Sequence, residues 1–247
     1  MKTFLRDTAI VFGREVTPAL RQPAGLLLEM GQPLLFLFLY GALLDGAVGS
    51  SWQWFVPGIL VMMCLTGPMA SGYTMLVELI GGSLERLLVT PLNRTAMLVG
   101  RTMKVTVVLL CQALLIVVLA LPLGFRLHPT GAPAGIAMLL LVATGLGSLS
   151  YTLAIRSAPD GTLFYLVTQA LLFPLMLLSG VFLPMSGGPS WLRAVGEVNP
   201  VTQVVDAQRA LFSGDLTHPS VLYGTAAAAL VAVLGLVAGN RALRKGV

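Results

Sequence analysis

The chain has 247 residues, of which 56% are hydrophobic and 10% are charged, and its formal net charge is +5. Typical globular domains carry about 25% charged residues, so this composition excludes a normal soluble surface. Its two cysteines, Cys64 and Cys111, lie in apolar stretches, which favours small packing residues over a disulfide framework or a metal site.

Six long apolar stretches indicate an integral membrane protein. A helix needs roughly 20 apolar residues to cross about 30 Å of hydrocarbon, and the strands of a β-barrel would be shorter and strictly alternating. We therefore predict an all-α membrane protein in which residues 1–247 form one domain. Its six transmembrane helices are expected at residues 23–44, 54–77, 103–123, 132–155, 162–183 and 221–239.

The basic residues predict the orientation of these helices. Twelve of the 15 lysines and arginines would lie on the side that carries both termini, and only Arg126, Arg193 and Arg209 on the other. By the positive-inside rule, both termini are then cytoplasmic. This asymmetry explains the positive net charge and requires no nucleic-acid partner.

Residues 1–22 predict an amphipathic helix at the membrane interface, followed by a bend at Pro23. Asp7, Arg14 and Arg21 share one face of this helix, which we expect to remain in water. The alternative is a cytosolic helix packed on a partner. The opposite face is apolar and consists of Leu5, Ala9, Phe12, Val16 and Leu20.

The first span contains Glu29 and Gln32, and a polar or ionisable group inside a span indicates a functional role by default. The alternative is that Glu29 lies near the cytoplasmic interface and reaches back to Arg21 or to water. Several aromatic residues of the spans would either line an apolar transport path or pack against lipid and other helices. They include Phe36, Tyr40, Tyr73 and Phe173.

Between the second and third spans, residues 83–91 predict a short amphipathic helix on the cytoplasmic side. Leu84, Leu87 and Leu88 have the i, i+3, i+4 spacing of one helical face. Ser83 can cap the first turn, and Pro91 biases the preceding residue away from helical geometry. We expect this helix to dock on another protein; the alternative is an ordinary solvated loop.

The outward segment of residues 184–219 predicts a helix of its own, with Asn199 as its cap and Pro200 at its first position. Such a helix covers only about 20 Å at 1.5 Å per residue, which is too short to span. It would lie at the outer interface or dip back into the membrane. Asp206 and Arg209, three residues apart, are expected to pair as a structural brace, the alternative being contact with a substrate.

Two stretches resemble the membrane subunit of type-2 ABC transporters, the ABC-2 permeases, and especially their small six-span group of daunorubicin-resistance-type exporters. The first is similar to a cytoplasmic Gly-Thr-Leu-Glu-x-Leu-Leu-x-Thr-Pro element of that family and reads Gly82-Ser83-Leu84-Glu85-Arg86-Leu87-Leu88-Val89-Thr90-Pro91. The second lies between Pro174 and Gly214 and includes Leu178-Ser179-Gly180-Val181-Phe182-Leu183-Pro184, Asn199-Pro200-Val201, Asp206 and Arg209-Ala210-Leu211.

The resemblance implies that residues 82–91 form a coupling helix that contacts an ABC ATPase subunit. It also implies two copies of that subunit, a second permease, identical or related, and a place in the bacterial cytoplasmic membrane. ATP and Mg would be bound by the ATPase, because Lys2, Lys104 and Lys245 all lie outside a Gly-x-x-x-x-Gly-Lys-Ser/Thr motif. The chain would then bind no cofactor and would be a transport subunit, not an enzyme.

The implied function is export of a hydrophobic or amphipathic compound, such as a drug, an antibiotic or a lipid, and hence multidrug efflux or antibiotic resistance. An exporter of lipids or polysaccharide precursors is the nearest alternative. An ion-coupled secondary transporter would place carboxylates or broken helices in a repeat, and no convincing repeat is present. An intramembrane enzyme is disfavoured because no His-Glu-x-x-His motif occurs and neither histidine lies in a span.

Overall fold

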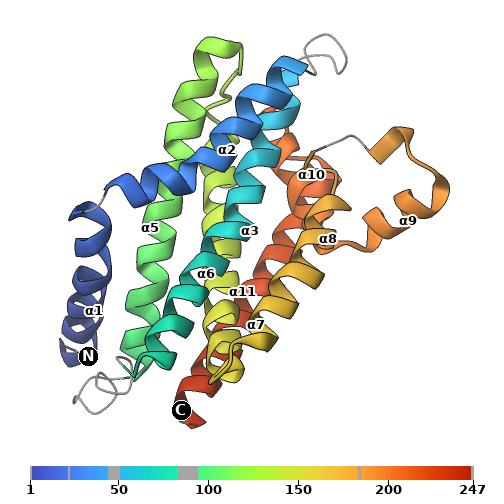
Figure 1. Cartoon of the computed structure of the whole chain (residues 1–247). Helices are drawn as coiled ribbons and strands as arrows, with labels where there is room; N and C mark the ends of the chain where they lie inside the picture. Colours follow the sequence, from blue (N-terminus) through green and yellow to red (C-terminus); the bar gives the residue numbers. More distant parts are fainter. Residues whose placement is uncertain (1, 22, 44–50, 83–93, 183–184, 246–247) are drawn as a thin grey trace.

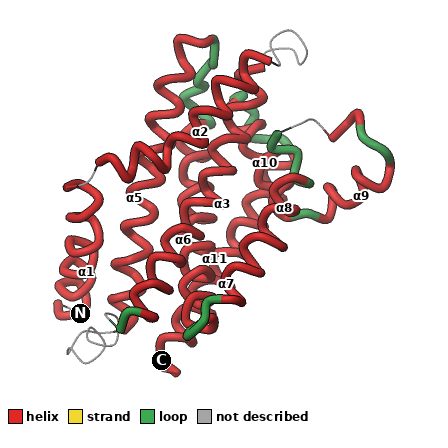
Figure 2. The backbone as a smooth tube through the Cα atoms, viewed as in Figure 1, coloured by secondary structure: helices red, strands yellow, loops and turns green. Residues whose placement is uncertain are grey.

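The computed structural model describes residues 2–21, 23–43, 51–82, 94–182 and 185–245 (Figure 1). The long helices are α1 (Lys2–Arg21), α2 (Pro23–Leu43), α3 (Ser51–Ile80), α5 (Arg94–Ala120), α6 (Ala132–Ser157) and α11 (Pro219–Lys245). The shorter elements are η1 (Leu121–Leu123), α7 (Thr162–Val167), the π-helical turn η2 (Thr168–Leu172), α8 (Phe173–Leu177), η3 (Met185–Gly187), α9 (Ser190–Val198) and α10 (Pro200–Phe212). The described residues contain no β-strand (Figure 2), which confirms the predicted all-α class for this part of the chain.

Four helices are long and apolar enough to cross a membrane, namely Trp52–Ile80, Thr95–Leu123, Ala132–Ser157 and Pro219–Ala242. Two shorter apolar helices, Leu27–Leu43 and Thr162–Leu177, take the places of the first and fifth predicted spans. The chain is thus a multi-pass membrane protein, and the number of six crossings stays a prediction. The start of α1 and the end of α11 lie at the same end of the helix bundle (Figure 1), hereafter the termini end.

Two helices differ in extent from the spans predicted within them, whose membrane bounds stay predictions. The helix of the fifth span ends at Leu177 and does not continue to residue 183, because the chain turns there: the Ser179 hydroxyl donates to the Met176 carbonyl, and Gly180 has a φ of +73°. The helix of the third span begins at Arg94, nine residues before its predicted start. Hydropathy marks only the apolar part of a helix, whereas the backbone continues through the charged turns.

The long helix α6 packs along both α3 and α11 in the middle of the bundle (Figure 1). Its contact with α11 is very close because glycines face each other: a Cβ atom on Gly235 would overlap the Gly145 carbonyl oxygen. A Cβ atom on Gly145 would in turn lie 2.6 Å from the Ala232 backbone. Small residues that allow such close approach are typical of helix contacts in membranes.

Helix α1 packs along α5, with Thr8 and Val11 at the contact, where a Cβ atom on Gly100 would lie 2.9 Å from the Val11 side chain. Leu5 and Leu20 on the apolar face are exposed, and are thereby available to lipid. The expectation that Asp7 stays in water is wrong, because its side chain is buried on the inner face of the helix together with Thr8 and Val11.

Helix α10 lies inside the bundle, against α3, α6 and α11, at the end opposite the termini. Val205 and Phe212 of this helix are fully buried. Helix α9, in contrast, projects away from the bundle (Figure 1). Whether this segment lies at the outer interface or dips back into the membrane stays a prediction.

Candidate functional site

Arg101 of α5 joins three helices at the termini end. Its guanidinium lies 3.3 Å from the Glu15 carboxylate of α1 and also forms an ion pair and a hydrogen bond with Glu78 of α3. The Arg101 side chain is only 5% exposed, while those of Glu15 and Glu78 are 15% and 23% exposed. Because separation would leave an uncompensated charge in a largely buried place, the three helices are held in one arrangement.

The Arg101–Glu78 pair connects the two helices that flank residues 83–93. Helix α3 ends at Ile80, two residues after Glu78, and Gly82 follows with a φ of +69°. Helix α5 begins at Arg94. Gly82 is the one predicted coupling residue that the structure describes; the other predicted coupling residues, Ser83, Leu84, Glu85, Arg86, Leu87, Leu88, Thr90 and Pro91, lie outside the described residues.

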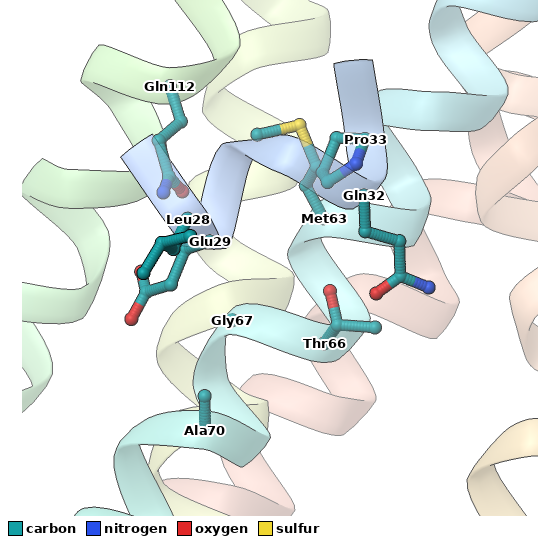
Figure 3. Close-up of a pocket in the computed structure, with 9 residues that line it drawn as sticks. All are labelled: Leu28, Glu29, Gln32, Pro33, Met63, Thr66, Gly67, Ala70 and Gln112. Atoms are coloured by element: carbon teal, nitrogen blue, oxygen red, sulfur yellow. The ribbon is translucent and has the colours of Figure 1, made fainter. Parts of the chain in front are cut away.

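A polar pocket of about 200 Å³ lies between α2, α3 and α5 (Figure 3). Two of the predicted path residues, Glu29 and Gln32, line it from α2, together with Thr66 of α3 and Gln112 of α5. Among the described residues, no ion pair involves Glu29, so the alternative contact with Arg21 is not seen there. The structure therefore brings a carboxylate and two amides to one cavity.

A second pocket of about 250 Å³ adjoins the first and shares Glu29 and Gln112 with it. It adds Tyr73 and Ser71 from α3 and Lys104 from α5. A carboxylate and an ammonium group thus line one polar region between otherwise apolar helices. We refer to these two adjoining cavities together as the α2–α3–α5 pocket.

Phe36 and Phe173, two further aromatic candidates, are not among the residues that line this pocket. Phe36 packs edge-on against Phe182, with ring centroids 5.3 Å apart. Phe173 lies on α8 and is 55% exposed. The Tyr40 side chain lies outside the described part of the structure. Among the aromatic path residues whose side chains the structure describes, Tyr73 therefore joins Glu29 and Gln32 in the pocket.

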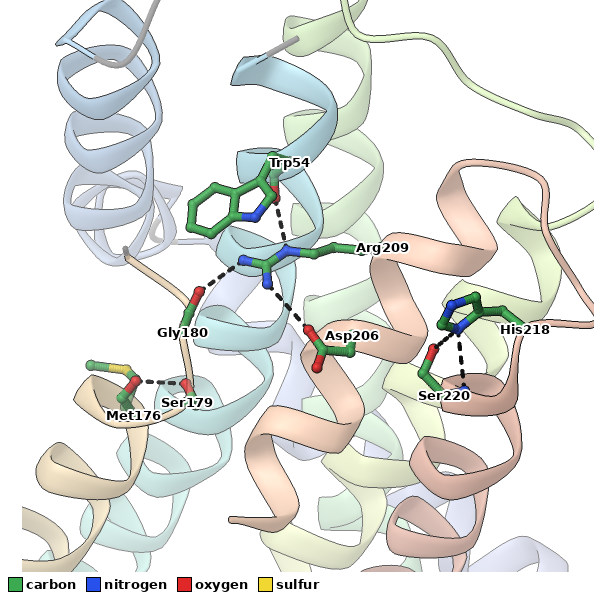
Figure 4. A network of polar contacts seen from close by, with 8 residues as sticks. All are labelled: Trp54, Met176, Ser179, Gly180, Asp206, Arg209, His218 and Ser220. Carbon is green, nitrogen blue, oxygen red and sulfur yellow. Dashed lines mark hydrogen bonds and ion pairs between the residues drawn. The ribbon is translucent and has the colours of Figure 1, made fainter. Parts of the chain in front are cut away.

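At the opposite end of the bundle, Arg209 of α10 holds three segments together (Figure 4). Its guanidinium lies 3.3 Å from the Asp206 carboxylate and donates to the carbonyls of Gly180 at 2.8 Å and Trp54 at 3.2 Å. It also stacks 3.9 Å from the centre of the Trp54 ring, a favourable cation–π geometry. Burial lowers the Arg209 pKa to about 10, with Asp206 opposing the change, so the group stays charged at neutral pH.

Asn199 fastens the start of α10. Its side-chain oxygen accepts a hydrogen bond from the Val201 amide at 3.0 Å, and its side-chain nitrogen donates to the Leu175 carbonyl at 2.7 Å. The first bond is a helix N-cap, and the second ties α10 to α8. The contacts of Asn199, Asp206 and Arg209 are thus directed at the protein itself, and their assignment as a brace stays a prediction.

Sequence reasoning missed the role of Arg101, Glu15, Lys104 and Gln112. Arg101 and Lys104 were counted only among the basic residues on the side of the termini, and Glu15 was not singled out, because hydropathy does not say which charges face one another. Gln112 could have been noticed, since it is a polar residue inside the apolar stretch 103–123. A polar side chain at such a depth indicates a functional position.

Comparison with known proteins places these features in a family. The family model described as "ABC-2 type transporter" matches residues 6–213. The chain is 29% identical over 231 residues to the transport permease ycf38 of Cyanophora paradoxa, covering 90% of this chain and 78% of the relative. It is 28% identical over 195 residues to the daunorubicin resistance ABC transporter permease protein DrrB1 of Streptomyces coeruleorubidus, covering 74% and 66%.

A further relative is the multidrug ABC transporter permease YbhR of Escherichia coli, which is 25% identical over 167 residues, covering 66% of this chain and 45% of the relative. The names of these relatives describe transport subunits and not enzymes. The family model covers most of the chain, including both stretches that carried the resemblance. The chain belongs to the ABC-2 type transporter family.

Proposed function

We propose that the chain is the membrane-spanning permease subunit of an ATP-driven exporter of hydrophobic or amphipathic compounds. The family match and the names of the drug-resistance relatives support this function. In this proposal the protein crosses the bacterial cytoplasmic membrane six times and has both termini in the cytoplasm. It works as a pair of permeases, identical or related, with two ABC ATPase subunits that bind ATP and Mg.

The observation that carries the proposal is the bridge from Arg101 to Glu78 and Glu15. Residues 83–90 are proposed to dock on the ATPase as the coupling helix. A force on this segment would reach α3 and α5, and the Arg101–Glu78 pair would prevent these helices from separating. Closure of the ATPase pair would thereby move α3 as a lever against the fifth span of the second permease.

The α2–α3–α5 pocket is proposed as a binding site for the transported compound on its path through the protein. Its Glu29 carboxylate would bind the cationic end of an amphipathic compound, and Gln32, Tyr73 and Gln112 would supply polar contacts. Around these groups the helices are apolar, which suits the rest of such a compound. A charged group on an apolar helix is costly unless it has such a use.

Reconstitution into liposomes tests the proposed function. The purified chain is incorporated with and without an ABC ATPase encoded beside it, and movement of daunorubicin and of a fluorescent phospholipid is followed. We expect transport only with the ATPase and ATP, and the preferred compound then separates drug export from lipid export. Transport by the chain alone, driven by an ion gradient, would contradict the proposal and favour a secondary transporter.

A further inference from the structure

An apolar groove of about 340 Å³ runs between α6 and the α7–η2–α8 helix, with Met69 of α3 at its side. It is separate from the α2–α3–α5 pocket and shares no residue with it. Leucines dominate its walls: Leu146, Leu149 and Leu153 from α6, and Leu171, Leu172 and Leu175 from η2 and α8.

The two threonines in the groove do not make it polar. The Thr152 hydroxyl donates to the Ser148 carbonyl at 2.9 Å, and the Thr168 hydroxyl donates to the Phe164 carbonyl at 2.8 Å. Each threonine therefore satisfies its hydrogen-bonding group within its own helix. A molecule in the groove would meet an almost wholly apolar wall.

One end of the groove is charged. Arg156 lines the groove where α6 nears its end, and its side chain is exposed. Within the described residues, Arg156 makes no ion pair. The next acidic residue along the chain, Asp160, accepts hydrogen bonds from the Thr162 amide at 3.2 Å and hydroxyl at 3.0 Å. The groove therefore combines a long apolar wall with a cation at its mouth that has no acidic partner in the described part of the chain.

The length of the groove matches one leaflet of a bilayer. Leu146 and Arg156 are ten residues apart on one helix, which corresponds to about 15 Å at 1.5 Å per residue. The hydrocarbon core of a bilayer is about 30 Å thick, so the groove extends over half of it. The end of the groove that carries Arg156 is at the C-terminal end of α6. This end of α6 lies on the same side of the bundle as the C-terminal end of α11 (Figure 1).

We propose that this groove binds one acyl chain of an anionic phospholipid from the leaflet at the termini end, with the lipid phosphate on the Arg156 guanidinium. Charge complementarity decides the head group, because a guanidinium and a phosphate form a strong, forked hydrogen-bonded pair. Because the length of the groove matches the thickness of one leaflet, the groove suits a single acyl chain. This inference does not depend on the chain's transport activity.

Native mass spectrometry tests the proposal on the full chain, purified from an equimolar mixture of phosphatidylglycerol and phosphatidylcholine. We expect wild type to retain one phosphatidylglycerol preferentially. Arg156→Gln should reduce this preference about fivefold, the effect of losing roughly 1 kcal/mol per basic residue. Arg156→Lys keeps the charge but not the forked geometry and should restore the preference in part. The matched control is Arg126→Gln, which removes an exposed arginine at the opposite end and should change nothing.

A second variant, Leu149→Trp, fills the groove with a bulky apolar side chain and should abolish retention of the lipid while Arg156 remains. Gel filtration of each variant checks that it is folded. Equal retention by wild type and both groove variants would overturn the proposal. A second permease that covers the groove would also overturn the proposal. It would be shown by a disulfide between two copies of Leu171→Cys, together with unchanged lipid binding in Arg156→Gln.

Discussion

The Arg101 guanidinium lies 3.3 Å from the Glu15 carboxylate, so helix α1 is held to helix α5, which begins at Arg94. Arg101 also pairs with Glu78, which makes it the shared cation of two carboxylates from different helices. Such an arrangement fixes how α1, α3 and α5 lie relative to one another near residues 83–93.

Arg101→Leu should destabilise the protein, because it leaves two carboxylates without their cation in a partly buried place. We expect a loss of about 3 kcal/mol, the low end of the range for breaking a buried pair, since Glu15 and Glu78 are partly exposed. Thermal unfolding in detergent measures the loss. Replacing Glu15 and Glu78 by glutamine in the same chain should recover most of it; no recovery would mean that packing, and not charge, is responsible.

Glu85→Ala and Leu87→Ala should uncouple the ATPase from transport. If residues 83–90 are the docking element, each variant loses contact with the ATPase while the spans remain intact. ATPase stimulation and daunorubicin transport are measured side by side in liposomes. Leu127→Ala, at an exposed leucine in the loop between η1 and α6, is the matched control. Wild-type transport in both coupling variants would refute the lever.

Glu29→Gln should weaken transport of a cationic amphipathic compound, because it removes the negative charge that Glu29 brings to the α2–α3–α5 pocket and keeps the shape of the side chain. The expected effect is a several-fold rise in KM, since an exposed charge contact contributes up to about 1 kcal/mol. Glu197→Gln, on the projecting helix α9, serves as the charge-matched control. An equal change in both variants would show that the effect is one of overall charge.

Arg209→Ala should loosen α10, because the Gly180 and Trp54 carbonyls lose their donor and the Trp54 ring loses its cation. We expect a loss of about 2 kcal/mol from these interactions together. A brace predicts a lower midpoint of thermal unfolding with an unchanged KM for the transported compound. A raised KM at unchanged stability would instead indicate contact with the substrate.

Gly235→Ala should destabilise the contact between α6 and α11, because its Cβ atom would overlap the Gly145 carbonyl oxygen. Overpacking of this kind costs about 1–3 kcal/mol. Gly13→Ala is the matched control, since a Cβ atom there meets nothing within 4 Å and alanine is the better helix former. Equal unfolding temperatures for both variants would show that the two helices can move apart freely.

The α2–α3–α5 pocket illustrates how far sequence reasoning reached. Glu29 and Gln32 stood out because polar residues are rare in apolar helices, and the structure brings both to the pocket. Lys104 and Gln112 come from α5, more than 70 residues away along the chain. Their proximity depends on how α2, α3 and α5 cross, and one sequence carries no direct signal of that.

The sequence by itself determined the class of the protein: only helices and closed β-barrels satisfy their backbone hydrogen bonds in hydrocarbon, and apolar stretches of about 20 residues without strict alternation are typical of helices. It also determined the cap at Asn199 and the motif at residues 82–91, because both are local patterns. Only the tertiary structure decided the partners of Arg101, the burial of Asp7 and the place of α10 within the bundle. These depend on which helix faces meet, and helix faces are brought together by packing between segments that lie far apart in the chain.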